Sequence, residues 1–427
     1  MMKLLYSLSI RCLISGIKIA SLFNNKAKQA IEGRKNWRKI ISDALKNNSD
    51  KIIWFHVSSL GEFEQARPLI IKIKTQFPEY KILLTFFSPS GYNARKNFEY
   101  ADWVFYMPYD TSGNARDFLD IVKPHSIIFV KYEFWLNFLN EIKRRKSNND
   151  KINCFLVSSI FRKHQPFFKW YGKIFVEALT AYDKIFVQDN LSIRLLKKIG
   201  IENNVILSGD TRVDRVIEIA QQNYTSKEIE NFCNGQTTII CGSTWYPDEQ
   251  ILVPVLSKYI SSHSIKIIIA PHQPDEKNVS KLIKLLENNK ITYCRFTHLS
   301  NSNIDEYKNS NVIIIDTVGV LNKIYRYGYL AYIGGGFTDG IHNILEPAVY
   351  GLPVIFGPKY EKFYEAVELI KSKGAFTIKN ISEFDNVLGK LLNDKQLYNS
   401  SQKAVNTFIK EHQGAVEKTI SELKRYF

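Results

Sequence analysis

The chain has 427 residues, of which 45% are hydrophobic and 13% aromatic. This composition supports large packed cores and excludes a disordered or fibrous protein, and the length is typical of two or three domains. Lys and Arg number 58 against 42 Asp and Glu, so the formal net charge is +16. Such a surplus predicts a polyanionic partner, namely nucleic acid, an anionic membrane face or a phosphorylated substrate, although solubility alone could also account for it.

The cysteines are scattered and form no C-x-x-C pair. Their pattern disfavours a zinc site or a disulfide framework and is typical of a reducing compartment. The five cysteines are Cys12, Cys154, Cys233, Cys241 and Cys294.

The first 23 residues are apolar but carry Lys3, Arg11 and Lys18. A spanning helix needs about 20 apolar residues with few charges, and a secretory signal needs a cleavage site, so neither pattern fits cleanly. We expect a helix that lies in a membrane interface with its apolar side in lipid. An ordinary domain helix and a transmembrane anchor are the alternatives. The basic residues that follow suit an anionic leaflet; they are Lys26, Lys28, Arg34, Lys35, Arg38 and Lys39.

From residue 51 onward, short β-branched or aromatic runs alternate with amphipathic stretches. This alternation predicts βαβ units and parallel sheets, and the runs form two series, with a join near 209–235. The predicted strands of the first series are 51–57, 81–87, 103–107, 126–131, 152–158, 184–188 and 205–208. Those of the second series are 237–241, 266–270, 291–295, 312–316, 330–334, 353–356 and 375–378. The amphipathic stretches include 62–77, 113–122, 133–145 and 275–289, and a long helical pattern covers 398–425.

Two carboxylates follow strands of the first series. In S-S-L-G-E-F-E, Glu62 falls at a helix start after strand 51–57, where it could act as a general base or simply stabilise the helix dipole. In K-Y-E-F-W, Glu133 follows strand 126–131 between aromatic residues that suit a sugar ring or core packing equally. In open α/β sheets ligands bind at the carboxyl ends of strands, so we expect both carboxylates to face a cleft.

The second series carries a glycine-rich motif. Gly334, Gly335 and Gly336 follow strand 330–334 and precede the run H-N-I-L-E-P. Glycines after a strand let backbone N–H groups approach a phosphate, and we expect a helix that starts near His342 or Asn343 and directs its positive end at the anion. A plain tight turn is the alternative.

Other strand ends in the second half carry polar turn residues, in C-G-S-T-W, A-P-H-Q-P-D and D-T-V-G, and G-D-T-R-V-D lies at the join. Each could be only a turn, but together they favour a shared cleft. The sequence contains no Walker loop, H-E-x-x-H or G-x-S-x-G element and no D-x-D run, so we expect no metal dependence.

In chain order, the segments HVSSLGEFEQARPLI, TFFSPSGY, YMPYDT, KYEFW, GDTRVD, CGSTW and IGGGF…GIHNILEP resemble bacterial 3-deoxy-D-manno-octulosonic acid (Kdo) transferases, from about residue 30 to about residue 370. The resemblance implies an α/β GT-B glycosyltransferase fold, with two Rossmann-like doubly wound domains that face a cleft. It implies transfer of Kdo from CMP-Kdo to a lipid A precursor (lipid IVA), with inversion and without a cofactor or metal. It places the enzyme on the anionic cytoplasmic face of the cell inner membrane.

On this basis we expect a membrane-associated helix over 1–30, an acceptor-binding domain over 31–209, a CMP-sugar-binding domain over 210–405 and a C-terminal helix over 406–427 that packs back on the first domain. The resemblance makes Glu62 the general base, and Glu133 and Arg212 residues that stabilise the transition state; Arg212 stands where the family usually has Lys.

The resemblance also implies contacts to CMP. These map to Pro271, His272, Val318, Gly319, Val320, Asn343, Ile344, Leu345 and Glu346. The chain departs from the family at two places. It has P-H-Q-P-D-E, including Gln273, where the family usually has P-R-H-P-E-R, and Val320 where the family often has Glu.

Two other functions are compatible with parts of the sequence. A GT-B transferase for another nucleotide sugar and envelope acceptor would share the H-N-x-x-E-P run, but not S-L-G-E together with K-Y-E-F-W. A non-catalytic basic protein could bind nucleic acid or membrane, but the chain has no recognition helix, RNP or OB signature, so we expect no nucleic-acid partner.

Overall fold

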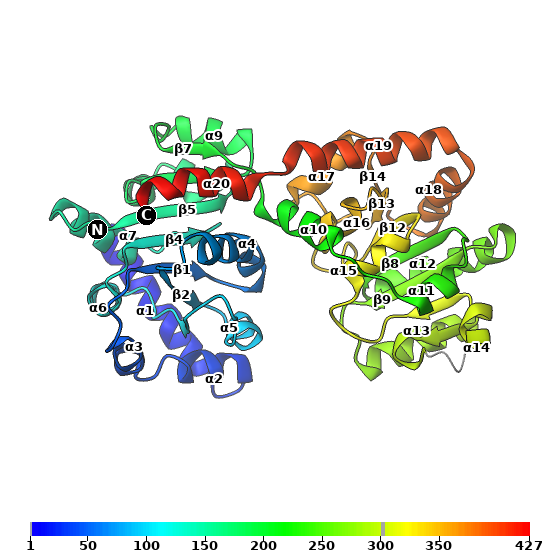
Figure 1. The fold of residues 1–427 in the computed structure, drawn as a ribbon, viewed down its shortest axis with the longest axis horizontal. Helices are drawn as coiled ribbons and strands as arrows, with labels where there is room; N and C mark the ends of the chain where they lie inside the picture. The colour runs from blue at the N-terminus through cyan, green and yellow to red at the C-terminus, as the bar shows by residue number, and fades with distance from the viewer. Residues whose placement is uncertain (1, 300–303) are drawn as a thin grey trace. The chain divides into compact units, whose positions relative to one another are not determined.

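The computed structural model describes residues 2–299 and 304–427 and contains two α/β units, each built on a seven-stranded parallel sheet (Figure 1). Unit 1 comprises Met1–Asp214 and Gln413–Phe427, and unit 2 comprises Arg215–His412. The predicted α/β class, with two doubly wound parallel sheets, is confirmed. The units divide at residues 214 and 412, where the sequence suggested boundaries at 209 and 405.

The sheet of unit 1 has the strand order β3-β2-β1-β4-β5-β6-β7. Its central strands are buried on both faces, as parallel strands covered by helices must be, which explains their nearly continuous apolar runs. The strands are β1 (Ile52–Val57), β2 (Lys81–Phe86), β3 (Trp103–Tyr106), β4 (Ser126–Val130), β5 (Asn153–Ser159), β6 (Lys184–Val187) and β7 (Val205–Leu207).

Helices cover both faces of this sheet. Helices α3, α6 and α7 pack on one face around Trp54 and Phe129, and α4 and α20 pack on the other around Phe55 and Ile128. The helices of unit 1 are α1 (Met2–Ala20), α2 (Asn25–Glu32), α3 (Trp37–Leu45), α4 (Leu60–Gln76), α5 (Pro89–Arg95), α6 (Ser112–Val122), α7 (Leu136–Ser147), α8 (Lys173–Leu179), α9 (Asn190–Lys197) and α20 (Ala415–Leu423); α10 (Thr211–Gln221) leads into unit 2.

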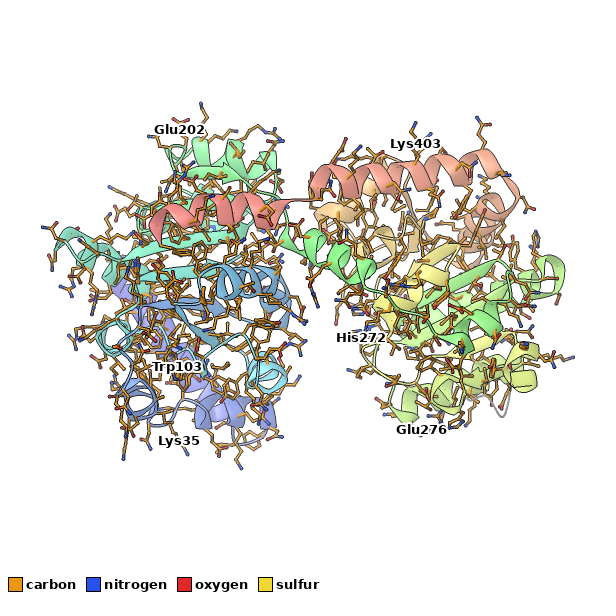
Figure 2. The ribbon with its side chains drawn as sticks, viewed as in Figure 1. Lys35, Trp103, Glu202, His272, Glu276 and Lys403 are labelled. Carbon is orange, nitrogen blue, oxygen red and sulfur yellow. The ribbon has the colours of Figure 1, made fainter. Side chains whose placement is uncertain are left out.

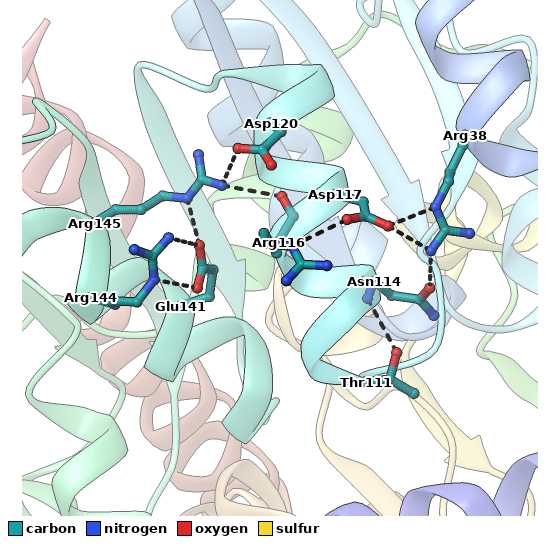
Figure 3. Close-up of polar contacts among 9 residues, drawn as sticks. All are labelled: Arg38, Thr111, Asn114, Arg116, Asp117, Asp120, Glu141, Arg144 and Arg145. Atoms are coloured by element: carbon teal, nitrogen blue, oxygen red, sulfur yellow. Dashed lines mark hydrogen bonds and ion pairs between the residues drawn. The ribbon is translucent and has the colours of Figure 1, made fainter.

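Ion pairs join the three helices on the first face (Figure 3). Arg38 of α3 lies 2.8 Å from Asp117 of α6, and Arg145 of α7 pairs with Asp120 of α6 and with Glu141 of its own helix. Arg38 and Asp120 are about half exposed or more, so the pairs that they form contribute little to stability, whereas Arg145 and Glu141 are largely buried.

The sheet of unit 2 has the order β10-β11-β9-β8-β12-β13-β14. Its strands are β8 (Thr238–Thr244), β9 (Lys266–Pro271), β10 (Tyr293–Arg295), β11 (Val312–Ile314), β12 (Leu330–Ile333), β13 (Val354–Phe356) and β14 (Ala375–Thr377). Its helices are α11 (Lys227–Cys233), α12 (Tyr246–His263), α13 (Glu276–Asn288), α14 (Ile304–Asn309), α15 (Leu321–Ile324), α16 (Leu345–Ala348), α17 (Tyr364–Lys371), α18 (Ile381–Asn393) and α19 (Lys395–His412). Helices α12, α13 and α18 share one apolar core with the sheet.

The helical pattern over 398–425 is interrupted in the structure. Helix α19 ends at His412 in unit 2, Gly414 adopts a left-handed conformation with φ of 85°, and α20 packs against α4 in unit 1. The Asp214 carboxylate accepts hydrogen bonds from the N–H groups of Gly414 and Val416, at 2.5 and 2.7 Å, and so caps α20.

Helix α1 has two different faces. On one, Ile10 is buried, and the Tyr6 hydroxyl donates a 2.5 Å hydrogen bond to Asp110, whose carboxylate also accepts from the N–H groups of Asn137 and Phe138 at the start of α7. The opposite face is apolar and exposed, with Leu4, Leu5, Leu8 and Ile19. Of the helices in the described part of the chain, none combines the length and apolar character needed to traverse a bilayer.

Candidate functional site

In each sheet there is a point where the chain, after building strands on one side of its first strand, continues on the other side. In unit 1 this point lies between β1 and β4, and in unit 2 between β8 and β12. In open α/β sheets, ligands bind at the carboxyl ends of the strands beside such a switch point. Glu62 follows β1 and Glu133 follows β4, so both predicted carboxylates flank the switch point of unit 1.

Glu62 lies in the first turn of α4 and is partly exposed. The Ser59 hydroxyl, at the N-cap of the helix, donates a hydrogen bond to its carboxylate. The contact orients the carboxylate of this partly exposed residue. This geometry is compatible with a general base, the role predicted for Glu62, which remains a prediction.

Glu133 is almost completely buried, with 1% exposed surface. Its carboxylate accepts a hydrogen bond from the Trp135 indole and lies 3.4 Å from the imidazole of His56, a fully buried residue of β1. Glu133, the predicted transition-state residue, is therefore enclosed by protein groups. The neighbouring Tyr132 is the exposed residue at this position.

Arg212 opens α10 and forms a two-pronged contact with Asp210, at 2.9 and 2.6 Å from Nε and Nη2. Burial opposes ionisation of Asp210, but the guanidinium outweighs it and lowers the pKa of that carboxyl. Burial raises the pKa of Tyr132, and the charges of Glu62 and Arg212 act on it in opposite directions. Thr211, next to Arg212, donates to the Gln65 carbonyl oxygen of α4 at 2.7 Å, so Glu62, Tyr132 and Arg212 all lie at the carboxyl edge of the unit 1 sheet.

In unit 2 two imidazoles and an indole stack beside the switch point. The rings of His272, after β9, and His342, after β12, are 3.9 Å apart and nearly parallel (His272 is labelled in Figure 2). Trp245, after β8, donates from its indole to His342 Nε2 at 3.0 Å. Burial, with a smaller effect from His272, lowers the pKa of His342 to about 4, so this imidazole is neutral at pH 7. The three aromatic rings are therefore grouped at the carboxyl edge of this sheet.

The glycine-rich turn differs from the sequence prediction. The Gly335 N–H donates to the Asp248 carboxylate at 3.0 Å, and the Gly334 N–H donates to the carbonyl of Gly242 at 2.9 Å. A Cβ on Gly334 would lie 2.2 Å from the Ser243 carbonyl oxygen. These two glycines therefore permit close packing of backbone segments, and their N–H groups are not free for a phosphate.

The helix after this turn also differs from the prediction. Helix α16 begins at Leu345 rather than near His342 or Asn343, and it lasts one turn. The Asn343 amide instead donates to Glu346 at 3.1 Å, so the two side chains form one polar pair. An anion near this segment would meet side chains and loop backbone rather than the end of a helix dipole.

The other predicted CMP contacts fall at carboxyl ends of strands of the same sheet. Pro271 ends β9, and Val318, Gly319 and Val320 lie in the loop after β11, where Val318 is 78% exposed. Ile344 and Leu345 are buried. The contacts of these residues with CMP stay predictions.

Comparison with known proteins shows similarity to one family. A family model described as 3-deoxy-D-manno-octulosonic-acid transferase (kdotransferase) matches residues 34–215. A 3-deoxy-D-manno-octulosonic acid transferase of Chlamydia trachomatis serovar A is 26% identical over 385 residues, which cover 87% of this chain and 85% of the relative. The resemblance to Kdo transferases predicted from the sequence motifs is thereby confirmed, and the relatives indicate a glycosyltransferase.

Two further matches concern length and fold. A bifunctional glycosyltransferase/methyltransferase of Fusobacterium nucleatum is 26% identical over 385 residues, which cover 88% of this chain but only 57% of that protein. The crystal structure of a UDP-GlcNAc 2-epimerase from Neisseria meningitidis has 13% identity and a TM-score of 0.62, with 88% of this chain and 100% of that chain covered. This likeness shows the fold alone, which is that of GT-B proteins.

Several polar residues around the Kdo transferase motifs were not selected from the sequence. His56 is hidden in the apolar run IIWFHV, and Asp248 and Glu249 resemble ordinary acidic residues of a first helical turn. Asp248 could have been found from its position three residues after Trp245, the N-cap of α12. A carboxylate at this position often accepts a hydrogen bond from the N-cap N–H, as Asp248 does here.

Glu249 gives a prediction for stability. Burial raises the pKa of Glu249 from 4.5 to about 7, although Thr244 donates a 2.8 Å hydrogen bond to it. The folded state therefore holds a proton that the unfolded state releases, so this contribution to stability is complete below pH 4.5 and is lost as the pH rises through 7. Between pH 5 and pH 8 the wild type should lose about 2 to 3 kcal/mol of its free energy of unfolding through this group. Glu249→Gln cannot ionise here and should not show this loss.

Urea unfolding followed by circular dichroism at the two pH values measures this difference. Glu361→Gln, which alters an exposed carboxyl of the same unit, is the control and should lose stability as the wild type does. An equal pH dependence in Glu249→Gln and the wild type would contradict the prediction.

Proposed function

We propose that the protein transfers Kdo from CMP-Kdo to a lipid A precursor, in a single displacement that inverts the anomeric centre. The observation that carries the proposal is the grouping of Glu62, Tyr132 and Arg212 at the switch point of unit 1, within the segment that matches the family model. The family names the sugar, and the residues supply an acid–base group and a cation for its transfer.

Glu62 would take the proton from the acceptor hydroxyl as that oxygen attacks the sugar. Its position is suited to this step because the Ser59 contact fixes one carboxylate oxygen while the residue remains partly exposed. Attack from the face opposite to the departing CMP inverts the anomeric centre and needs no covalent sugar–enzyme intermediate.

Arg212 would stabilise negative charge, either on the departing phosphate or on the sugar carboxylate. Its guanidinium is always cationic, and the Asp210 contact fixes its orientation before a substrate binds.

The nucleotide would bind to unit 2. Its base would stack on the rings of Trp245, His272 and His342. Its ribose hydroxyls would bind to Glu346, which pairs with Asn343.

The alternative function is that of a GT-B transferase for another activated sugar. The two functions differ in the nucleotide that the donor carries. CMP release from CMP-Kdo should depend on the lipid acceptor, and UDP-GlcNAc should give no acceptor-dependent UDP release. The reverse result would replace the proposed donor by a UDP-sugar.

The enzyme would act on the anionic cytoplasmic face of the inner membrane, with α1 at the interface. The apolar outer face of α1 supports this location, because Leu4, Leu5 and Leu8 are 76%, 52% and 56% exposed while the other face is anchored in unit 1. Deleting the helix would remove the Tyr6–Asp110 contact as well, so replacement of the outer leucines is the cleaner test.

Replacing Leu4, Leu5 and Leu8 by Gln should weaken binding to anionic vesicles at high salt on the order of 100-fold, if each side chain contributes about 1 kcal/mol at the interface. High salt screens the cationic contribution, so the remaining binding reports the apolar one. Vesicle flotation at low and high salt measures it, with Ile381→Gln in unit 2 as the matched exposed-apolar control. Unchanged high-salt binding of the triple variant would show that α1 does not enter lipid.

A further inference from the structure

The imidazole of His56 links two strands to the segment that carries Glu133. His56 is completely buried in β1, and its neighbour across the sheet is Thr85 of β2. Its Nδ1 atom lies 2.8 Å from Thr85 Oγ1, and its Nε2 atom lies 3.4 Å from Glu133 Oε2. The Trp54 indole donates to Thr85 Oγ1 at 2.8 Å, so the hydroxyl already accepts one hydrogen bond.

The position of the imidazole proton follows from the Thr85 hydroxyl, which has one proton to donate. If that proton points to His56 Nδ1, a neutral ring carries its proton on Nε2, directed at Glu133. If it points to the Phe55 carbonyl oxygen, 3.3 Å away, Nδ1–H donates to Thr85 instead. Nε2 then faces a carboxylate, and two lone pairs oppose each other unless a proton lies between them. Among the described residues Nε2 makes no hydrogen bond of normal geometry. Both arrangements therefore call for a proton on Nε2, directed at Glu133 Oε2 at 3.4 Å.

We propose that His56 is a positioning residue, which holds the Glu133 carboxylate through this proton and thereby fixes the turn over 131–135 at the switch point. The proposal rests on the proposed transferase function. A buried carboxylate needs donors: the Trp135 indole is one, and His56 Nε2, 3.4 Å away with no hydrogen-bond partner of its own among the described residues, is placed to be the second.

The turn that is held in this way carries groups that face the candidate site. Lys131 adopts a left-handed conformation with φ of 73°, which is unusual for a residue other than glycine and requires support from its surroundings. Tyr132 follows it and is exposed. The Tyr182 hydroxyl, from the segment before β6, donates to the Glu133 carbonyl oxygen and fixes the backbone at the same place.

Two substitutions separate the two ring nitrogens. The amide nitrogen of Gln reaches the position of Nε2, so His56→Gln keeps a donor for Glu133, whereas the amide of Asn reaches only the position of Nδ1. We expect His56→Gln to keep kcat within about threefold, and His56→Asn to lower kcat roughly 10- to 100-fold with little change in KM for CMP-Kdo, as for the loss of one hydrogen bond to a charged group.

A double-mutant cycle with Glu133→Gln tests whether His56 acts through Glu133. In that background His56→Asn should cause no further loss of kcat, because the carboxylate that it positions is absent. The proposal would be overturned if the losses of kcat in His56→Asn and Glu133→Gln multiplied in the double variant. It would also be overturned if His56→Gln and His56→Asn lost kcat equally. Either result would show that His56 only packs in the core.

Nitrogen NMR of protein labelled with ¹⁵N-histidine tests the contact without any activity. The signals that His56→Gln removes belong to His56, and they should show a protonated Nε2 in the wild type. A neutral ring protonated only on Nδ1 would overturn the proposal. If the wild-type protein transfers no Kdo, the proposed function fails, while this measurement still decides the contact between His56 and Glu133.

Discussion

Glu62→Gln should lower kcat by about 10²- to 10⁴-fold, the contribution typical of a general base. The amide keeps the size of the carboxylate and can still accept the hydrogen bond from Ser59, so the fold and the donor affinity should remain. What is lost is only the ability to take the proton of the acceptor hydroxyl. Initial rates of CMP release at saturating CMP-Kdo and acceptor measure the effect, and CMP titration measures the donor affinity.

The neighbouring Glu64 provides a matched control. It lies on the same helix, two residues further along, and its carboxylate pairs with Arg95 at 3.1 Å and with Arg67 at 3.7 Å near the surface. Glu64→Gln should keep kcat within about twofold, because a surface ion pair of this kind contributes little. If Glu62→Gln retained more than a tenth of the wild-type kcat with unchanged stability, Glu62 would not be the base.

Arg212→Met should lower kcat/KM by about 10²- to 10³-fold, the loss expected when one preorganised charge stabiliser is removed. It should also lower the free energy of unfolding by about 3 kcal/mol, because it leaves the mostly buried Asp210 carboxylate without its guanidinium. The Asp210 pKa is lowered in the folded protein, so this stability is present above pH 3.8 and is lost as the pH falls through the lower, folded-state value.

Arg212→Lys separates the two effects. The resemblance places a Lys at this position in most relatives, so this variant should keep kcat/KM within about tenfold, while it loses the two-pronged contact with Asp210 and part of the stability. Arg116→Met, at a largely exposed position of α6, controls for the loss of a positive charge. Full activity in Arg212→Met would exclude Arg212 from the reaction.

The strands could be predicted because each is a short β-branched or aromatic run bounded by turn residues, as Ile52–Val57 illustrates. Order along the chain then placed Glu62 and Glu133 at the carboxyl ends of β1 and β4, and the structure shows that these strands are neighbours. Local sequence was sufficient here because a strand end fixes where the next residue lies in a parallel sheet.

What could not be predicted depends on contacts between segments far apart in the chain. The partner of Tyr6 is Asp110, 104 residues away, and nothing in an amphipathic helix indicates it. The Gly335 N–H was expected to meet a phosphate, but Asp248, 87 residues earlier, accepts its hydrogen bond. The helical period over 398–425 continues across Gly414, so only the left-handed backbone there reveals that the two helices belong to different units.

The most direct test is analysis of the product formed from lipid IVA and CMP-Kdo by the purified protein. Mass spectrometry should show the acceptor heavier by one or more Kdo residues, with one CMP released for each, and NMR should show an anomeric configuration opposite to that of the donor. A lipid acceptor of unchanged mass in the presence of CMP-Kdo, or a product with the donor's configuration retained, would contradict the proposed reaction.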